Sequence, residues 1–410
     1  MAITQVRAQL GGIWYVLSYD ETQRCYVAEI PAGETSADQP SGWYNVTVEA
    51  TNDAGTTVST DGNGLESLRL VVKDLTAPTL ALVSPPQGYI TTQTPEIVVD
   101  MTDDSSGVNL ETLAVSIDGE SESNVNTSAI TGGYRATISP TLEDGLHTVE
   151  ISVQDQDENI GVLSLIYTVD TIPPKLAVWD HRLVIDDPTV LIQGTAQDSA
   201  GASVAVSAGS WIENTGPAAD GTWMAFVPLE IGTNTITVTA TDGAGLTTSW
   251  SGTVVRMITD RSQTDLDKLR SILNDFASGA ESTEDWADIN KPTQRGGYNY
   301  TDLNRVGAAA KLLTESLNGQ GYNVVTSPKT NWTELDTPTE STMGVYLKNV
   351  ETIFEVRLVQ EQDVILPDSI SGLMLAGANN IEWALVCVDA VTPVVRKSYV
   401  YSGEAFAGEF

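Results

Sequence analysis

One short phrase occurs three times in this chain and constrains its fold more than any other feature. The three copies are Tyr44–Gly55, His147–Asn159 and Asn234–Gly245. In each copy, residues of alternating polarity run into a turn rich in Asn, Asp and Gly. Alternation with a period of two is typical of a strand with one buried face, and such turns close hairpins. We therefore expect the same hairpin at the same place in three successive β-sandwich modules.

Two proline-containing joints divide the repeats. Residues 73–78 and 169–174 each end a strand-like segment and open the next, and proline stiffens such linkers. Near residues 254–260 the apolar period changes to that of helices. The sequence thus predicts a multidomain chain of three β-sandwich (immunoglobulin-like) modules and a mainly helical α+β C-terminal module. The expected modules are a variant β-sandwich at 1–74, immunoglobulin-like sandwiches at 75–171 and 172–257, and the helical module at 258–410.

The last module is expected to contain four helices. Its apolar residues recur at the i, i+3 and i+4 spacing of an amphipathic helix, and Thr, Asp and Gly stand at the positions of caps. The expected elements are helices over 264–276 (capped by Thr264), 301–318, from 339 onward and 378–391, followed by β-like segments at 398–403 and 405–408.

The charge of the chain restricts its partners. There are 55 Asp and Glu residues against 20 Lys and Arg residues, a formal net charge of −35. A phosphate backbone would be repelled, so we expect no nucleic-acid partner. No apolar run reaches the about 18 residues that a membrane span needs. The first ten residues lack the apolar core of a signal peptide, so we expect assembly in the host cytoplasm and no membrane insertion.

Catalytic machinery is not apparent in the sequence. The chain holds two histidines, His147 and His181, both in or beside expected strands. There is no phosphate-binding loop, dinucleotide fingerprint, CxxC or HExxH motif. Carboxylates are so numerous that no pair stands out as a glycosidase acid and base. We therefore expect a protein that is not an enzyme.

The turn after the second repeat could bind a divalent cation. Asp155, Asp157 and Asn159 place three oxygen ligands at alternate positions, which lets a loop wrap a hard cation such as calcium. Asp170 at the following joint, or Asp103 and Asp104 in a facing loop, could complete the site. The alternative is a turn rich in Asp and Asn that simply tolerates unusual backbone angles. No motif in the sequence requires a cofactor. Calcium is the one cofactor for which the oxygen ligands of this turn are suited.

Two tryptophans raise the question of sugar binding. Trp211 and Trp223 flank a stretch rich in Gly and Asp, so an exposed indole could stack on a host-surface glycan. The alternative is that both rings fill the core of the sandwich or cover its end. Trp179, near the second joint, has the same ambiguity.

Several phrases of the last module resemble a module found in phage proteins. They are Arg295–Arg305, Leu317–Tyr322, Trp332–Met343, Tyr346–Val350, Gly377–Glu382 and Tyr401–Glu409. In this order they resemble tail-associated structural proteins of phages and prophages of Gram-positive gut bacteria. The preceding modules are similar to bacterial immunoglobulin-like domains, which phages carry on tail, fibre, baseplate and capsid proteins. The resemblance implies a virion location, other virion proteins as partners and a homo-oligomer.

Large rings mark the expected assembly interface of this module: Tyr298, Tyr300, Trp332, Tyr346 and Trp383. Trp383 opens an apolar segment that continues to Val388, which favours burial or a subunit contact. The alternative for the tyrosines and Trp332 is that they pack one helix on the next within a single chain.

The leading hypothesis is a phage virion structural protein of the tail, baseplate or fibre. Its last module would anchor it to the particle, and its sandwiches would project for weak, multivalent adhesion to the host or its glycans. Two alternatives remain: a capsid or tail-tube decoration protein, and a calcium-stiffened glycan-binding adhesin.

Overall fold

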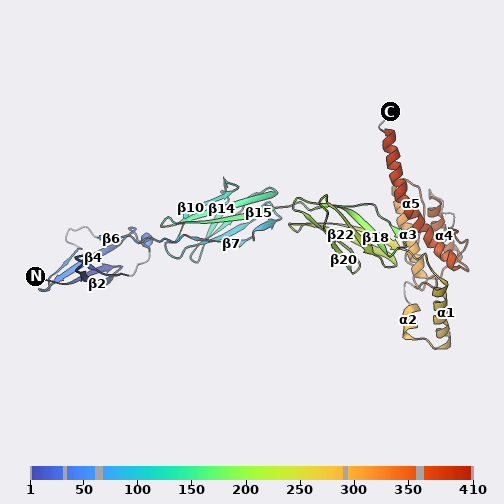
Figure 1. The fold of residues 1–410 in the computed structure, drawn as a ribbon, viewed down its shortest axis with the longest axis horizontal. Helices are drawn as coiled ribbons and strands as arrows, with labels where there is room; N and C mark the ends of the chain where they lie inside the picture. Colours follow the sequence, from blue (N-terminus) through green and yellow to red (C-terminus); the bar gives the residue numbers. More distant parts are fainter. Residues whose placement is uncertain (1, 31–34, 61–67, 290–293, 357–363, 408–410) are drawn as a thin grey trace. The chain divides into compact units, whose positions relative to one another are not determined.

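The computed structural model describes the chain except residues 1, 31–34, 61–67, 290–293, 357–363 and 408–410. The chain divides into two compact units, Met1–Thr171 and Ile172–Phe410, here called unit 1 and unit 2 (Figure 1). Sandwich-type sheets precede a helical region, which confirms the predicted fold class. Among the described helices, none combines the length and apolarity needed to cross a membrane.

The first module of unit 1 is a single sheet in its described residues. It contains a 3-10 turn at Ser36–Asp38 and strands in the order β3-β2-β1-β4-β5, with β6 also pairing β4. Its buried apolar side chains include Val6 and Ala8, so this module encloses little core. The sequence predicts a variant β-sandwich for 1–74, whereas the described residues of this module form one sheet. The strands are β1 Ile3–Leu10, β2 Ile13–Asp20, β3 Cys25–Val27, β4 Tyr44–Asn52, β5 Thr57–Ser59 and β6 Leu68–Leu70.

The second module of unit 1 is a two-sheet sandwich. Its sheets run β11-β10-β14-β15-β8 and β12-β13-β9-β7 and enclose an apolar core. Ile97, Val99 and Met101 of β9 are fully buried at alternate positions, as a strand with one core face requires. The strands are β7 Thr79–Ser84, β8 Gly88–Ile90, β9 Ile97–Thr102, β10 Val108–Ile117, β11 Glu120–Ser121, β12 Val125–Ile130, β13 Gly133–Ile138, β14 Gly145–Asp155 and β15 Ile160–Val169.

Unit 2 begins with a second sandwich. Its sheets run β16-β18-β21 and β17-β23-β22-β19-β20. The strands are β16 Lys175–Val178, β17 Val184–Ile185, β18 Thr189–Gln197, β19 Ala202–Ala208, β20 Trp211–Thr215, β21 Thr222–Pro228, β22 Gly232–Asp242 and β23 Thr247–Arg256. The three repeated phrases form β4, β14 and β22 with their turns, and each pairs with the strand that follows it.

The helices largely follow the predicted pattern, but α2 (Thr283–Ile289) was not predicted, and two further expectations are corrected. Ser262, not Thr264, caps the first helix, because its side chain and that of Asp265 each accept the other's backbone N–H. The β-like segments expected at 398–403 and 405–408 are wrong up to Ala407, because α5 continues through them; residue 408 lies outside the described residues. The helices are α1 Gln263–Ser278, α2 Thr283–Ile289, α3 Tyr300–Gly319, α4 Glu340–Glu355 and α5 Leu375–Ala407.

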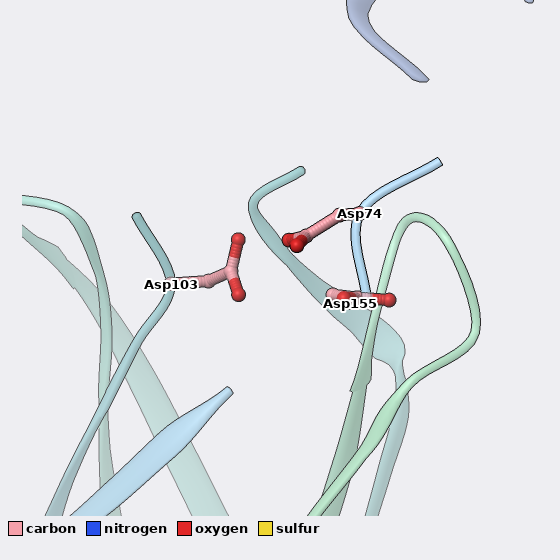
Figure 2. Close-up of side chains that lie close together, drawn as sticks. All are labelled: Asp74, Asp103 and Asp155. Atoms are coloured by element: carbon pink, nitrogen blue, oxygen red, sulfur yellow. The ribbon is translucent and has the colours of Figure 1, made fainter. Parts of the chain in front are cut away.

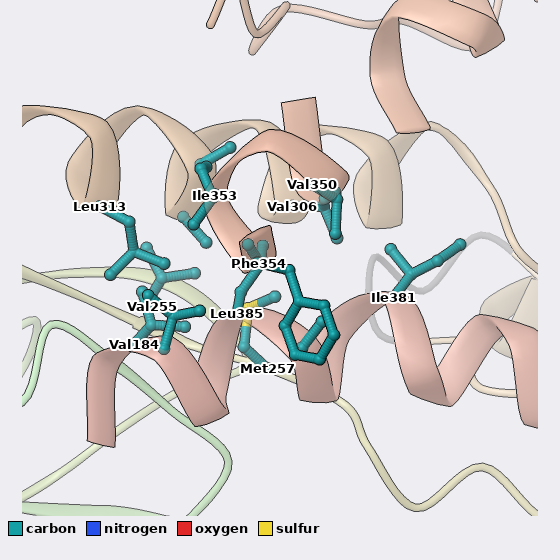
Figure 3. Close-up of a cluster of buried hydrophobic side chains, with 14 of the residues drawn as sticks. Val184, Val255, Met257, Val306, Leu313, Val350, Ile353, Phe354, Ile381 and Leu385 are labelled. Atoms are coloured by element: carbon teal, nitrogen blue, oxygen red, sulfur yellow. The ribbon is translucent and has the colours of Figure 1, made fainter. Parts of the chain in front are cut away.

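The sandwich and the helices of unit 2 share a core. Val254 on β23 belongs to the interior of the sandwich, whereas its neighbour Val255 packs with the helices. On β17, Ile185 and Val184 divide in the same way. Successive strand residues point to opposite faces, so this edge of the sheet is buried on both sides. Figure 3 shows Val184, Val255 and Met257 among side chains from α3, α4 and α5.

The shared core predicts that the two parts of unit 2 unfold together. Leu385 of α5 is fully buried in it. We expect Leu385→Ala to lower the free energy of unfolding by about 2–5 kcal/mol and to speed hydrogen exchange of the β22 and β23 amides as well as those of α3 to α5. The control is Val345→Ala on α4, where 47% of the residue is exposed. Loss of protection confined to the helices would contradict a common core.

Candidate functional site

The turn between β14 and β15 is built around one buried carboxylate. Asp155 Oδ1 accepts the backbone N–H groups of Asp157 at 2.9 Å and Asn159 at 2.8 Å. Asn159 Nδ2 donates to the other oxygen of Asp155 at 2.6 Å. Glu158 between them has a positive φ of 75°. The carboxylate therefore fixes the conformation of this turn through hydrogen bonds to its backbone.

Two further aspartates converge on Asp155. Asp103 follows β9 and accepts the N–H of Gly107 at 2.6 Å, and Asp74 accepts the N–H of Ser106 at 3.3 Å. One carboxylate oxygen from each of the three lies within 4.8 Å of the others. Figure 2 shows Asp103 across from Asp74 and Asp155. This carboxylate group stands where the first module meets the second.

The structure brings together some of the predicted metal ligands and separates others. Asp157 turns to the joint, where Oδ2 accepts the Asp74 N–H at 2.8 Å and also bonds the hydroxyl of Thr35. Asn159 presents its amide nitrogen, which donates to the Asp74 carbonyl at 3.0 Å, rather than an oxygen. Asp170 follows β15, whose last residue pairs Gly145 while its first pairs Gln154. It therefore lies at the opposite end of the hairpin, about 30 Å away.

The carboxylate group can hold a hard cation or remain a network of hydrogen bonds. Three carboxylates offer the oxygen ligands that calcium prefers. The hydroxyl and backbone N–H of Thr76 bond Asp74 and lower its pKa, so this carboxylate is ionised near neutral pH. Negative charges at this spacing repel one another, and a bound cation would relieve that repulsion.

Calcium binding stays a prediction of the sequence, and Asp103→Asn tests it. The asparagine keeps an oxygen for the turn but removes one charge. We expect the variant to melt above the wild type in EDTA, because repulsion is relieved, and calcium to raise the melting temperature of the wild type more than that of the variant. The control is Asp104→Asn, at an exposed neighbour. Equal melting temperatures of the wild type with and without calcium would contradict the prediction.

The two tryptophans predicted to bind a glycan both contact the core of the second sandwich. Trp223 on β21 is 4% exposed and packs in the core, so it cannot stack on an external sugar. Trp211 opens β20, is partly buried and packs against the same core. The core-filling alternative thus describes both rings. Trp179 differs from them, since 44% of this residue is exposed.

The large rings of the helical module also divide into buried and exposed ones. The hydroxyls of Tyr298 and Tyr346 are 2.6 Å apart, and Trp332 and Tyr346 are buried among the helices. Packing within the chain therefore accounts for these three. Tyr300 and Trp383 remain accessible, with 38% and 37% of each residue exposed. Of the expected interface residues, these two are available to a partner.

A buried cluster of four charges was not foreseen from the sequence. The carboxylate of Glu382 on α5 accepts hydrogen bonds from the guanidinium groups of Arg261, at 2.5 Å, and of Arg305 on α3, at 2.7 Å. Arg261 also donates to Asp302 at 2.7 Å. The Ile258 N–H, just after β23, donates to Glu382 at 2.6 Å. A signal was present: Arg305 and Glu382 interrupt the apolar stripes of two helices.

The cluster is electrically balanced, and this fixes its response to pH. Burial favours the neutral form of Glu382, but the guanidinium groups of Arg305 and Arg261 outweigh burial and lower its pKa. A carboxyl whose folded pKa is depressed stabilises the protein above its unfolded pKa. That stabilisation is lost as the pH falls through the folded pKa. Unit 2 should therefore lose stability in acid below about pH 4.5, the ordinary value for glutamate.

Glu382→Gln tests the cluster directly. It leaves two buried guanidinium groups facing one carboxylate, so we expect unit 2 to lose about 3–5 kcal/mol of unfolding free energy. The loss should shrink in acid, because protonation of this carboxyl in the unfolded state removes the stabilisation that it gives the wild type. The control is Glu351→Gln on α4, whose pair with Lys348 is exposed to solvent and should contribute little to stability. Chemical denaturation at pH 7 and pH 3.5 measures both effects, and a loss equal to that of the control would contradict the assignment.

The two histidines have structural partners. His147 forms a 2.7 Å ion pair with Asp118, and the His181 Nδ1 lies 3.1 Å from the carbonyl oxygen of Trp179. His147 is held by a carboxylate and by the Glu143 carbonyl, and these contacts outweigh burial and raise its pKa. Neither contact includes a serine or cysteine nucleophile.

Comparisons with known proteins give a likeness in fold. No family model and no curated protein matches the sequence. The fibronectin(III)-like modules of Clostridium thermocellum CbhA are 16% identical over 43% of this chain and 94% of theirs, with a TM-score of 0.31. Domains A168–A170 of titin are 12% identical over 61% and 87%, with a TM-score of 0.34. A tandem repeat from the extending region of a large adhesion protein is 19% identical over 61% and 66%, with a TM-score of 0.26.

These neighbours are tandem sandwiches of the immunoglobulin and fibronectin type.

Proposed function

We propose that the protein is a non-enzymatic structural component of a phage particle, in its tail, baseplate or fibre. Unit 2 anchors the chain to other virion proteins and to further copies of itself. The sandwiches project and make weak contacts with the host surface that gain strength from repetition. The sequence resemblance of the last module supports the virion setting.

The observation that carries this proposal is the shared core of unit 2. A helical module hung on a flexible linker would let a sandwich swing freely about its anchor. Here the helices bury one face of β17 and β23 while the facing sheet buries the other. A load on the sandwich therefore reaches the helices through packed side chains, as a rigid attachment base requires.

The anchoring surface is proposed to include Trp383 and Tyr300. Trp383 stands on α5 beside Ala384 and Leu385, which are fully buried. An exposed indole next to an apolar helix face is the kind of residue that dominates binding at protein interfaces.

Particle incorporation of Trp383→Ala tests the proposal. Immunogold labelling of full-length protein should decorate the particles released from producing cells, and the variant should be depleted from them at least tenfold while remaining folded. The control is Leu273→Ala, which removes another exposed apolar side chain on α1. A wild-type protein found as a soluble monomer and never on particles would contradict the proposal.

The position of the gold label separates the alternatives. Label along the shell or tube would favour a decoration protein, and label at the tail end would favour a baseplate or fibre component. The remaining alternative is a glycan-binding adhesin with calcium-stiffened joints, and an aromatic cavity in unit 2 supports its sugar-binding part.

A further inference from the structure

A cavity of about 230 Å³ lies between the sandwich of unit 2, formed by β16 to β23, and the helices of the same unit. Its wall combines Trp179 and His181, which follow β16, with Trp250 of β23. The end of α3 contributes Gln320, which caps that helix, and α5 contributes Asp389 and Thr392. Every contributing element belongs to unit 2, so the cavity is built by the fold of one unit.

The aromatic wall is held in place by hydrogen bonds and ring contacts. The Trp179 backbone N–H donates to the Gln193 carbonyl at 2.8 Å, which continues the pairing of β16 with β18. His181 stands edge-on to Trp250, with ring centroids 5.4 Å apart and an interplanar angle of 87°. Because the supporting backbone is fixed, the exposed Trp179 ring offers a flat apolar surface without a large cost of ordering.

Polar groups line the rest of the cavity. Gln320 Nε2 donates to Ser316 Oγ at 3.2 Å, which leaves the amide oxygen of Gln320 to accept from a ligand. The hydroxyl of Thr392 donates to the Val388 carbonyl at 2.7 Å, so its oxygen can also accept. The carboxylate of Asp389 forms an ion pair with the guanidinium group of Arg182 at 2.6 Å, which fixes its position. An aromatic face beside several oriented acceptors suits a ring that has apolar C–H faces and a rim of hydroxyl groups.

Size and charge narrow the class of ligand. A cavity of about 150 Å³ takes a benzene ring, so about 230 Å³ has room for one saturated six-membered ring with its substituents. The ion pair with Arg182 balances the charge of Asp389 in the lining. The chain as a whole carries −35. Sialic and uronic acids would therefore be repelled, and neutral sugars would not.

We propose that this cavity binds one neutral pyranose unit of a glycan, either a hexose or an N-acetylhexosamine, stacked on Trp179. The inference deepens the adhesion part of the proposed function and moves the sugar site from Trp211 and Trp223 to the seam between sandwich and helices. It does not depend on the protein being part of a particle.

The experiment begins with the full-length protein on an array of neutral and acidic glycans, followed by titration with methyl glycosides of glucose, galactose and N-acetylglucosamine. We expect binding of neutral glycans, weakened at least tenfold by Trp179→Ala and less by Trp179→Phe. Gln320→Ala should weaken it through the lost acceptor. Circular dichroism and the melting temperature show whether each variant is folded; the exposed Trp179 should be removable without unfolding unit 2.

Two variants separate this inference from the proposed function. Trp383→Ala should bind glycans as the wild type does yet fail to join particles, whereas Trp179→Ala should join particles yet lose the glycan. A blank array, a preference for acidic glycans, or equal binding by wild type and a folded Trp179→Ala would overturn the sugar site. Loss of incorporation by Trp383→Ala would still support the anchor in each of those cases.

Discussion

The edge of the sheet formed by β17 and β23 is the constraint on which unit 2 depends. Val254 and Val255 are neighbours in sequence but serve two cores, one between the sheets and one under the helices. Neither side can be removed without exposing a row of buried apolar residues to water. The helical module thus needs the sheet to bury its core, and the sheet needs the helices to bury its outer face.

The buried charge cluster lies at the segment that connects the sheet to the helices. Ile258 and Arg261 belong to the segment that leads from β23 into α1, and they meet Asp302 and Arg305 of α3 and Glu382 of α5. Moving such groups out of water is costly, and mutual attraction compensates only when the geometry is good and hydrogen bonds are complete. A shifted helix would leave a charge unpaired, so we infer that the cluster fixes how α3 and α5 sit on the chain leaving the sheet. The apolar core alone tolerates sliding more readily.

Local patterns predicted the elements well and their long-range partners poorly. The repeated phrase identified β4, β14 and β22, because alternation and turn chemistry are local properties. The change of period near residue 257 marked the start of the helices, but the apolar pair Val254–Val255 was not recognised as a strand buried on both faces. The turn at Asp155 was foreseen, whereas Asp74 as its neighbour was not. That contact joins residues 81 positions apart, and spacing along the chain does not reveal it.

The chain uses two physically different ways to connect its modules, and they respond to different conditions. In unit 1 the first sheet meets the second module through carboxylates, a threonine hydroxyl and backbone amides around Asp74 and Asp157. The strength of such a contact depends on charge, and therefore on pH, salt and cations. In unit 2 the connection is a packed apolar core together with the buried charge cluster around Glu382, and salt affects both little because they are out of contact with water. Stiffness at the proposed anchor is thus built into the fold, while the geometry of the first joint is left open to adjustment by the surrounding solution.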